Sequence, residues 1–158
     1  TPTLEVGEEE WSRILDTNLT GTLRACQVFG RHMLERRSGR IVNVASLGAF
    51  VSLLEVAAYN ASKAAVAALT RSLAIEWGPR GVNVNAIAPG VFRTPLNEEL
   101  IDGTARGREL VERTPLRRHG RLEELQGACV LLSSEAASFI NGEVVVVDGG
   151  FLAAGVLS

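Results

Sequence analysis

The sequence predicts an α/β fold in which long helices cover a doubly wound parallel sheet of three strands. Short apolar segments at residues 40–45, 81–88 and 143–147 alternate with helical segments along the chain, an order typical of a parallel sheet. Their apolar content suits strands that are buried on both faces. Small or polar residues follow each segment, and open α/β sheets bind ligands at the carboxyl ends of their strands. We therefore expect a ligand site at this edge of the sheet.

Composition narrows the class of protein. A chain of 158 residues fits one domain, and 46% hydrophobic with 22% charged residues is typical of a globular protein. The formal net charge of −2 provides no basic surface for nucleic acid or an anionic membrane. No apolar run approaches the ~18 residues of a membrane span, and the first residues lack a signal-peptide pattern. We expect a cytoplasmic protein without nucleic-acid or membrane partners.

The two cysteines, Cys26 and Cys129, lie in helical patterns and lack the spacing of metal ligands. Buried thiols in a reducing compartment are the preferred interpretation. We predict no metal site.

The first long helix is predicted from residue 8 to about residue 35. Glu8, Glu9 and Glu10 lie where the positive end of a helix dipole favours acids, and apolar residues then recur at three- and four-residue steps. Residues 16–21, which include Asn18, form helix poorly. This patch indicates either a kink with a polar task for Asn18 or an ordinary asparagine.

The next elements lead into the predicted ligand site. Ser46 follows the first strand, where it either faces a ligand or caps the next element. A loop over residues 47–56 precedes an alanine-rich helix over residues 57–77, which Gly78-Pro79 should end. The second strand ends in a small polar turn from Pro89 to Pro95, which also suits a ligand.

The C-terminal third is less regular. Short helices are expected at residues 98–101 and 108–113, inside an irregular stretch that suits a lid or binding loop. Its arginines indicate either an anionic substrate or a solvated surface. A last helix is expected over residues 122–133, and we expect the apolar tail, residues 151–158, to pack on a neighbouring subunit.

Tyr59 and Lys63 are the only tyrosine and the only lysine of the chain. A spacing of four residues puts both on one face of the predicted helix, one turn apart. A phenol, with an ordinary pKa near ~10, exchanges protons poorly at neutral pH, but a nearby ammonium favours the phenolate. Such a pair can act as a general acid/base, although the same spacing also fits a helix-start aromatic and a solvated surface charge.

Several motifs occur together in one order along the chain. They are Asn18-Leu19-Thr20-Gly21, Gly39-Arg40-Ile41-Val42-Asn43, Ser46, Tyr59-x-x-x-Lys63, Val82-Asn83-x-Asn85-x-Ile87-x-Pro89-Gly90, Thr94 and Val147-Asp148-Gly149-Gly150. Over almost the whole chain this arrangement resembles the single-domain branch of the short-chain dehydrogenase/reductase family. Residues 118–125 and 139–142 also resemble its sugar-acid and polyol dehydrogenases and its 3-oxoacyl reductases. The resemblance implies that residues 1–158 form the catalytic and C-terminal part of one such domain, with part of a Rossmann-type sheet.

The resemblance also implies an activity, the interconversion of a secondary alcohol and a ketone. Tyr59 would exchange a proton with the substrate oxygen, and Ser46 would hydrogen-bond the same oxygen. Lys63 would favour the phenolate of Tyr59 and bind the nicotinamide ribose. Asn18 would hold a water that relays protons to Lys63.

The implied cofactor is NAD or NADP. Its nicotinamide end would contact Tyr59 and Lys63, and the turn from Pro89-Gly90 to Thr94 would hold the carboxamide. Val91 would offer backbone groups to it and Thr94 its hydroxyl. The implied substrate is a small alcohol or ketone. The implied assembly is a homo-oligomer, a tetramer or a dimer.

One family feature is absent from this sequence. It contains no Thr-Gly-x-x-x-Gly-x-Gly or G-x-G-x-x-G turn, the element that brings a pyrophosphate to a helix N-terminus. Two hypotheses follow. Either these residues are part of a complete reductase, or they form a truncated, non-catalytic protein that acts at most through oligomerisation. On either hypothesis we expect residues 1–158 alone to have negligible affinity for NAD or NADP, and the first strand to lie at an exposed edge of the sheet.

Overall fold

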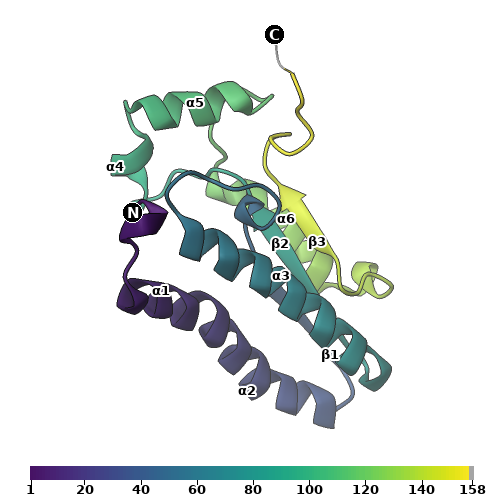
Figure 1. The fold of residues 1–158 in the computed structure, drawn as a ribbon. Helices are drawn as coiled ribbons and strands as arrows, with labels where there is room; N and C mark the ends of the chain where they lie inside the picture. The colour runs from purple at the N-terminus through teal and green to yellow at the C-terminus, as the bar shows by residue number, and fades with distance from the viewer. Residues whose placement is uncertain (157–158) are drawn as a thin grey trace.

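The fold, a computed structural model that describes residues 1–156, is built on a parallel sheet of three strands in the order β1-β2-β3 (Figure 1). The strands are β1 (Gly39–Val44), β2 (Val82–Pro89) and β3 (Val144–Val147). Gly39 lies opposite Val82, and Ala86 opposite Val144. The predicted α/β class with three parallel strands is confirmed, and each strand lies within one residue of its predicted bounds.

Residues 1–156 form six α-helices (Figure 1). Their bounds are α1 Glu8–Leu15, α2 Gly21–Glu35, α3 Ala57–Trp77, α4 Glu98–Ile101, α5 Ala105–Arg113 and α6 Gln126–Ser133. Helix α3 has the bounds predicted for it. Helix α5 begins three residues earlier than predicted, because the hydroxyl of Thr104 accepts a hydrogen bond from the Gly107 N–H and caps it.

Helices cover both faces of the sheet. Successive side chains of β2 point to opposite faces, and buried apolar ones lie on each. Val82, Val84, Ala86 and Ala88 face one side, in the clusters formed with α2 and α3. Ile87 faces the other, against Leu132 of α6. Because all three strands are parallel, their carboxyl ends lie at the same edge of the sheet.

A π-helical segment, Asp16–Thr20, joins α1 to α2. Its signature is the hydrogen bond from the Gly21 N–H to the Asp16 carbonyl, which spans five residues instead of four. The helix predicted as one unit is thus interrupted at the poorly helix-forming patch around Asn18.

Strand β1 pairs only with β2 among the described residues, so it is an edge strand. The side chain of Val44 at its end is exposed, as the prediction of an open edge requires. In the C-terminal tail, the guanidinium of Arg113 lies 5.8 Å from the centre of the Phe151 ring. The predicted packing of this tail on a neighbouring subunit remains a prediction, and residues 157 and 158 lie outside the described part.

None of the helices described is both long enough and apolar enough to span a bilayer.

Candidate functional site

A cavity of about 320 Å³ opens at the carboxyl ends of β1 and β2. Ser46 follows β1, Gly90 and Val91 follow β2, and Tyr59 projects from the first turn of α3. The remaining walls come from the loop after Ser46 and from the α4–α5 segment. The volume is at the lower end of the range typical of small-molecule sites, about 300–1,000 Å³.

Ser46 is held so that its hydroxyl proton remains available. Its side chain is only 6% exposed, and its Oγ accepts a hydrogen bond of 3.1 Å from the Gly48 N–H. That bond occupies a lone pair of the hydroxyl and leaves its single donor for another group. An oxygen atom bound in the cavity can accept that bond.

Tyr59 and Lys63 lie one turn apart on α3, as their spacing predicted. The Lys63 Nζ is 5.7 Å from the centre of the Tyr59 ring and donates a hydrogen bond of 2.9 Å to the Val44 carbonyl. Burial lowers the pKa of Lys63 from its ordinary value, because desolvation disfavours the ammonium form. The Nζ has three N–H donors and uses one on Val44, so two remain.

Asn18 reaches the same turn of α3 through a buried serine. Its Nδ2 donates a hydrogen bond of 3.0 Å to the Oγ of Ser62, which itself donates one of 2.7 Å to the carbonyl of Tyr59. Ser62 is completely buried. The π segment therefore places Asn18 against the helix that carries Tyr59 and Lys63.

The turn after β2 is only partly inside the cavity. Gly90 and Val91 line it, whereas Pro89 and Thr94 do not. The backbone N–H and the hydroxyl of Thr94 both donate to the Oδ1 of Asn97, at 2.8 and 3.2 Å. In this structure the Thr94 side chain therefore stabilises its own turn.

Sequence reasoning did not single out several residues that support the site. Gly48 fixes Ser46, Ser62 joins Asn18 to α3, and Asn97 holds the turn that contains Thr94. Asn60 donates a hydrogen bond of 3.0 Å to the Leu53 carbonyl and ties the loop after Ser46 to α3. Asn60 and Ser62 lie within the Tyr-Asn-Ala-Ser-Lys stretch, which was the available signal.

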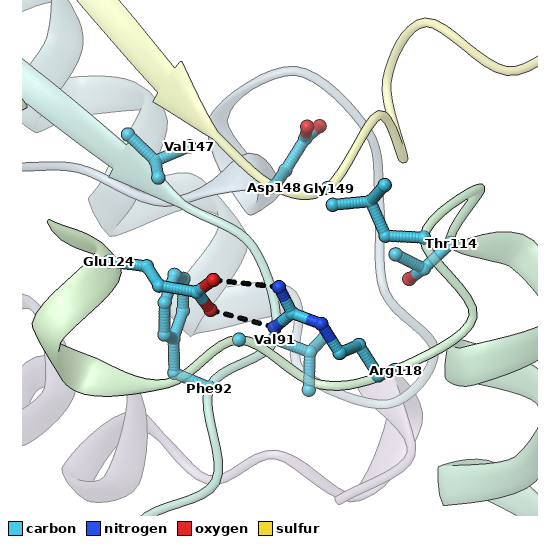
Figure 2. Close-up of a pocket in the computed structure, with 10 residues that line it drawn as sticks. Val91, Phe92, Thr114, Arg118, Glu124, Val147, Asp148 and Gly149 are labelled. Carbon is cyan, nitrogen blue, oxygen red and sulfur yellow. Dashed lines mark hydrogen bonds and ion pairs between the residues drawn. The ribbon is translucent and has the colours of Figure 1, made fainter.

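A second, smaller cavity of about 140 Å³ also has Val91 in its wall (Figure 2). Figure 2 shows Arg118 and Glu124 facing each other there, joined by two hydrogen bonds of 2.7 Å. The Arg118 guanidinium, with help from the Arg121 N–H, lowers the pKa of Glu124 to about 2. Each charge is neutralised by the other, and Ser46 and Tyr59 do not line this cavity. We therefore place the candidate site in the larger cavity.

Within residues 1–156, no three His, Cys, Asp or Glu side chains gather as metal ligands would.

The architecture defines a class of protein: part of a Rossmann-type α/β fold with a small-molecule cavity at the carboxyl ends of its strands. A family model described as Enoyl-(Acyl carrier protein) reductase matches residues 1–152. The chain belongs to the short-chain dehydrogenase/reductase family.

Curated relatives include enzymes for acidic and for neutral compounds. The chain is 43% identical over 145 residues to 2-dehydro-3-deoxy-D-gluconate 5-dehydrogenase of Bacillus subtilis, covering 92% of this chain and 57% of that protein. It is also 43% identical over 150 residues to D-threitol dehydrogenase of Mycolicibacterium smegmatis, covering 95% of this chain and 57% of that protein. The chain thus spans less than two thirds of the length of these relatives.

A solved structure agrees with the fold. The gluconate 5-dehydrogenase of Burkholderia cenocepacia, crystallised in complex with NADP and tartrate, has a TM-score of 0.95 and 36% identity to this chain. The match covers 98% of this chain and 61% of that one.

Proposed function

We propose that residues 1–158 are the catalytic and C-terminal part of a short-chain dehydrogenase/reductase domain, which interconverts a secondary alcohol and a ketone with NAD or NADP. The observation that carries this proposal is the placing of Ser46 and Tyr59 on one cavity, with Lys63 one helical turn away. The named activities of the relatives support it.

The proposed acid/base step uses the chain's own groups. The substrate oxygen lies between the hydroxyls of Ser46 and Tyr59, and Ser46 donates the hydrogen bond that its contact with Gly48 leaves available. Tyr59 gives a proton to this oxygen during reduction or accepts one during oxidation. Lys63 stabilises the phenolate form of Tyr59 by its positive charge.

The proposed cofactor contacts also come from these elements. The two remaining N–H donors of Lys63 fit the hydroxyls of a ribose, and Gly90 and Val91 fit a flat ring at the cavity wall. A nicotinamide cofactor, when bound, supplies or accepts the hydride. Pro89 and Thr94 act indirectly in this proposal, by shaping the turn. Asn18 orders the helix turn of Lys63 through Ser62 and holds the proton-relay water there.

The proposed setting is the cytoplasm, and the proposed assembly is a homo-oligomer. Both cysteines are free thiols, and Cys26 is buried beside Asn43, which suits a reducing compartment. The apolar side chains of Val28 and Phe29 are exposed on α2, which suits burial against another subunit.

An alternative function rests on the same exposed face. In it, the protein has no catalytic activity and acts only by association through α2. An assay of hydride transfer separates the two, because only the oxidoreductase consumes NAD or NADP when sugar acids and polyols are supplied.

The substitution Tyr59→Phe tests the proposed mechanism. It removes the proton-exchanging hydroxyl and keeps the ring, so we expect turnover to fall about 100-fold or more while cofactor affinity stays within about twofold. Steady-state kinetics and fluorescence titration with NADPH and NADH, both on the full natural chain that contains residues 1–158, measure the two effects.

Ser72→Ala is the matched control for this test. Ser72 is exposed on the same helix and bonds only the Ala68 carbonyl, so its loss should leave turnover unchanged. Full activity of Tyr59→Phe would contradict the proposed role. Inactivity on every sugar acid and polyol with either cofactor, measured on the full natural chain that contains residues 1–158, would favour the alternative function.

A further inference from the structure

The cavity that contains Ser46 and Tyr59 has mainly aliphatic walls. Leu53 and Val56 line it from the loop after Ser46, and Leu96, Leu100 and Leu110 line it from the α4–α5 segment. Aliphatic walls offer no hydrogen bonds to the hydroxyls of a polyol, so any polar recognition must come from a few placed groups.

One of those groups is charged. Arg106, near the start of α5, is the only charged residue among the described residues that line this cavity. Arg106 is partly buried, and its guanidinium donates a hydrogen bond of 2.7 Å to the Leu54 carbonyl. A guanidinium has five N–H donors, so donors remain for a ligand.

Two neighbouring arginines differ from Arg106 in their partners, whereas Arg108, like Arg106, donates to a backbone carbonyl. Arg93 is paired with Asp102 and Glu98, and Arg113 with Glu109. In the part of the chain that the structure describes, Arg106 has no carboxylate within ion-pairing distance. A partly buried cation without an anionic partner leaves its charge unbalanced, and an anion bound beside it would be favoured.

The guanidinium is also held in place. Its bond to Leu54 ties α5 to the loop after Ser46, and Asn60 holds the adjacent Leu53 carbonyl from α3. The cation is therefore fixed between the two walls of the cavity before any ligand binds, which reduces the entropy lost on binding.

We propose that Arg106 binds the carboxylate of the substrate, so that the protein acts on a hydroxy or oxo monocarboxylic acid in preference to a neutral polyol. A carboxylate matches the planar fork of a guanidinium and carries the single charge that one arginine neutralises. A phosphate ester carries about −1.5 to −2 charges, which one cation does not balance. The proposal rests on the proposed function, and it chooses between the acidic and the neutral substrates named for the relatives.

Gluconate and glucitol form the matched probe pair, because they differ only in the carboxylate that replaces one terminal alcohol. In Arg106→Met, which keeps the apolar stem and loses the charge, we expect kcat/KM for gluconate to fall about tenfold or more. For glucitol we expect a change below about twofold. Arg106→Lys, which keeps the charge and loses the fork, should recover part of the loss for gluconate.

Arg108→Met is the control on the same helix. Arg108 donates to the Gly103 carbonyl and does not line this cavity, so its substitution should leave the preference for gluconate intact. Circular dichroism and thermal unfolding establish that each variant is folded.

A binding measurement makes the test independent of hydride transfer. Isothermal titration of gluconate and 3-hydroxybutyrate into the wild type should show binding that Arg106→Met loses. An equal fall in kcat/KM for gluconate and glucitol would assign Arg106 a structural role and overturn the proposal. Absence of binding by both acids, or binding unchanged in Arg106→Met, would also overturn it.

Failure of this proposal is distinguishable from failure of the proposed function. Turnover of glucitol that is independent of Arg106 leaves the oxidoreductase function standing and removes the carboxylate site. Arg106-dependent binding of acids without any hydride transfer leaves the carboxylate site standing and removes the oxidoreductase function.

Discussion

At the scale of single residues, the proposed chemistry depends on how each group is held by a neighbour. Ser46 keeps its proton available because the Gly48 N–H occupies its oxygen, and Asn60 packs against that glycine. A Cβ at position 48 would lie 2.7 Å from the Asn60 Oδ1, so only glycine fits there without movement. The loop after Ser46 and the first turn of α3 are therefore built as one unit.

Lys63 is the only lysine of the chain, and its burial makes stability depend on pH. Burial lowers its pKa in the folded state below the ordinary value of 10.5. Between these two values the unfolded chain binds more protons than the folded one. The free energy of unfolding therefore increases as the pH rises through this window. The cost of burying the ammonium is fully present below the lowered pKa and disappears above 10.5.

We expect the wild type to gain stability relative to Lys63→Met as the pH rises through that window. Urea unfolding of both proteins at pH values from 7 to about 10.5 measures the difference, since Met keeps the apolar stem and does not titrate. Parallel pH profiles would show that Lys63 is not desolvated in the folded protein.

At the scale of elements, α2 and α3 approach closely because glycine lies at their contact. A Cβ on Gly30 would lie 2.6 Å from the ring of Trp77, which is only 7% exposed. Gly127 in α6 is the opposite case, since a Cβ there would meet nothing within 4 Å. The contact with Trp77 therefore requires glycine at position 30, whereas position 127 has room for a larger residue.

The pair Gly30→Ala and Gly127→Ala gives opposite expected signs. Overpacking costs about 1–3 kcal/mol and outweighs the gain in helix propensity of up to about 1 kcal/mol, so Gly30→Ala should destabilise the fold by roughly 1 kcal/mol. Gly127→Ala should stabilise it by up to about 1 kcal/mol. Urea denaturation measures both, and an equal gain in stability for the two variants would contradict the tight contact.

Sequence patterns predicted elements better than they predicted contacts. The bounds of α3 followed from its alanine-rich run and from Gly78-Pro79, which are local signals. The break at residues 16–20 was indicated by poor propensity, but its π geometry and the contact of Asn18 with Ser62 were not, because Ser62 belongs to another helix. Similarly, Arg106 was one of several arginines in an irregular stretch until the fold placed it on the cavity.

At the scale of the whole molecule, large apolar side chains are exposed on the outer surface of two long helices. Phe29 on α2 is 63% exposed and Ile75 on α3 is 80% exposed. These helices lie side by side on one face of the sheet (Figure 1). Exposed large apolar side chains on long helices suit an interface between subunits.

We expect Phe29→Asp to shift the protein to a smaller oligomer, because a buried carboxylate at an interface is costly. Size-exclusion chromatography with light scattering measures the mass. Leu4→Asp is the control, since Leu4 is fully exposed near the N-terminus and away from α2. Identical masses for the wild type and Phe29→Asp would remove α2 from the interface.

The π segment between α1 and α2 can be gained or lost by the insertion or deletion of a single codon. A turn closed over five residues holds one residue more than an α-helical turn, so one inserted codon is enough to create it and one deleted codon is enough to remove it. The hydrogen bond from Asn18 to Ser62 depends on that turn. A three-nucleotide insertion or deletion can therefore add or remove this link to the proposed acid/base pair while every other codon stays the same.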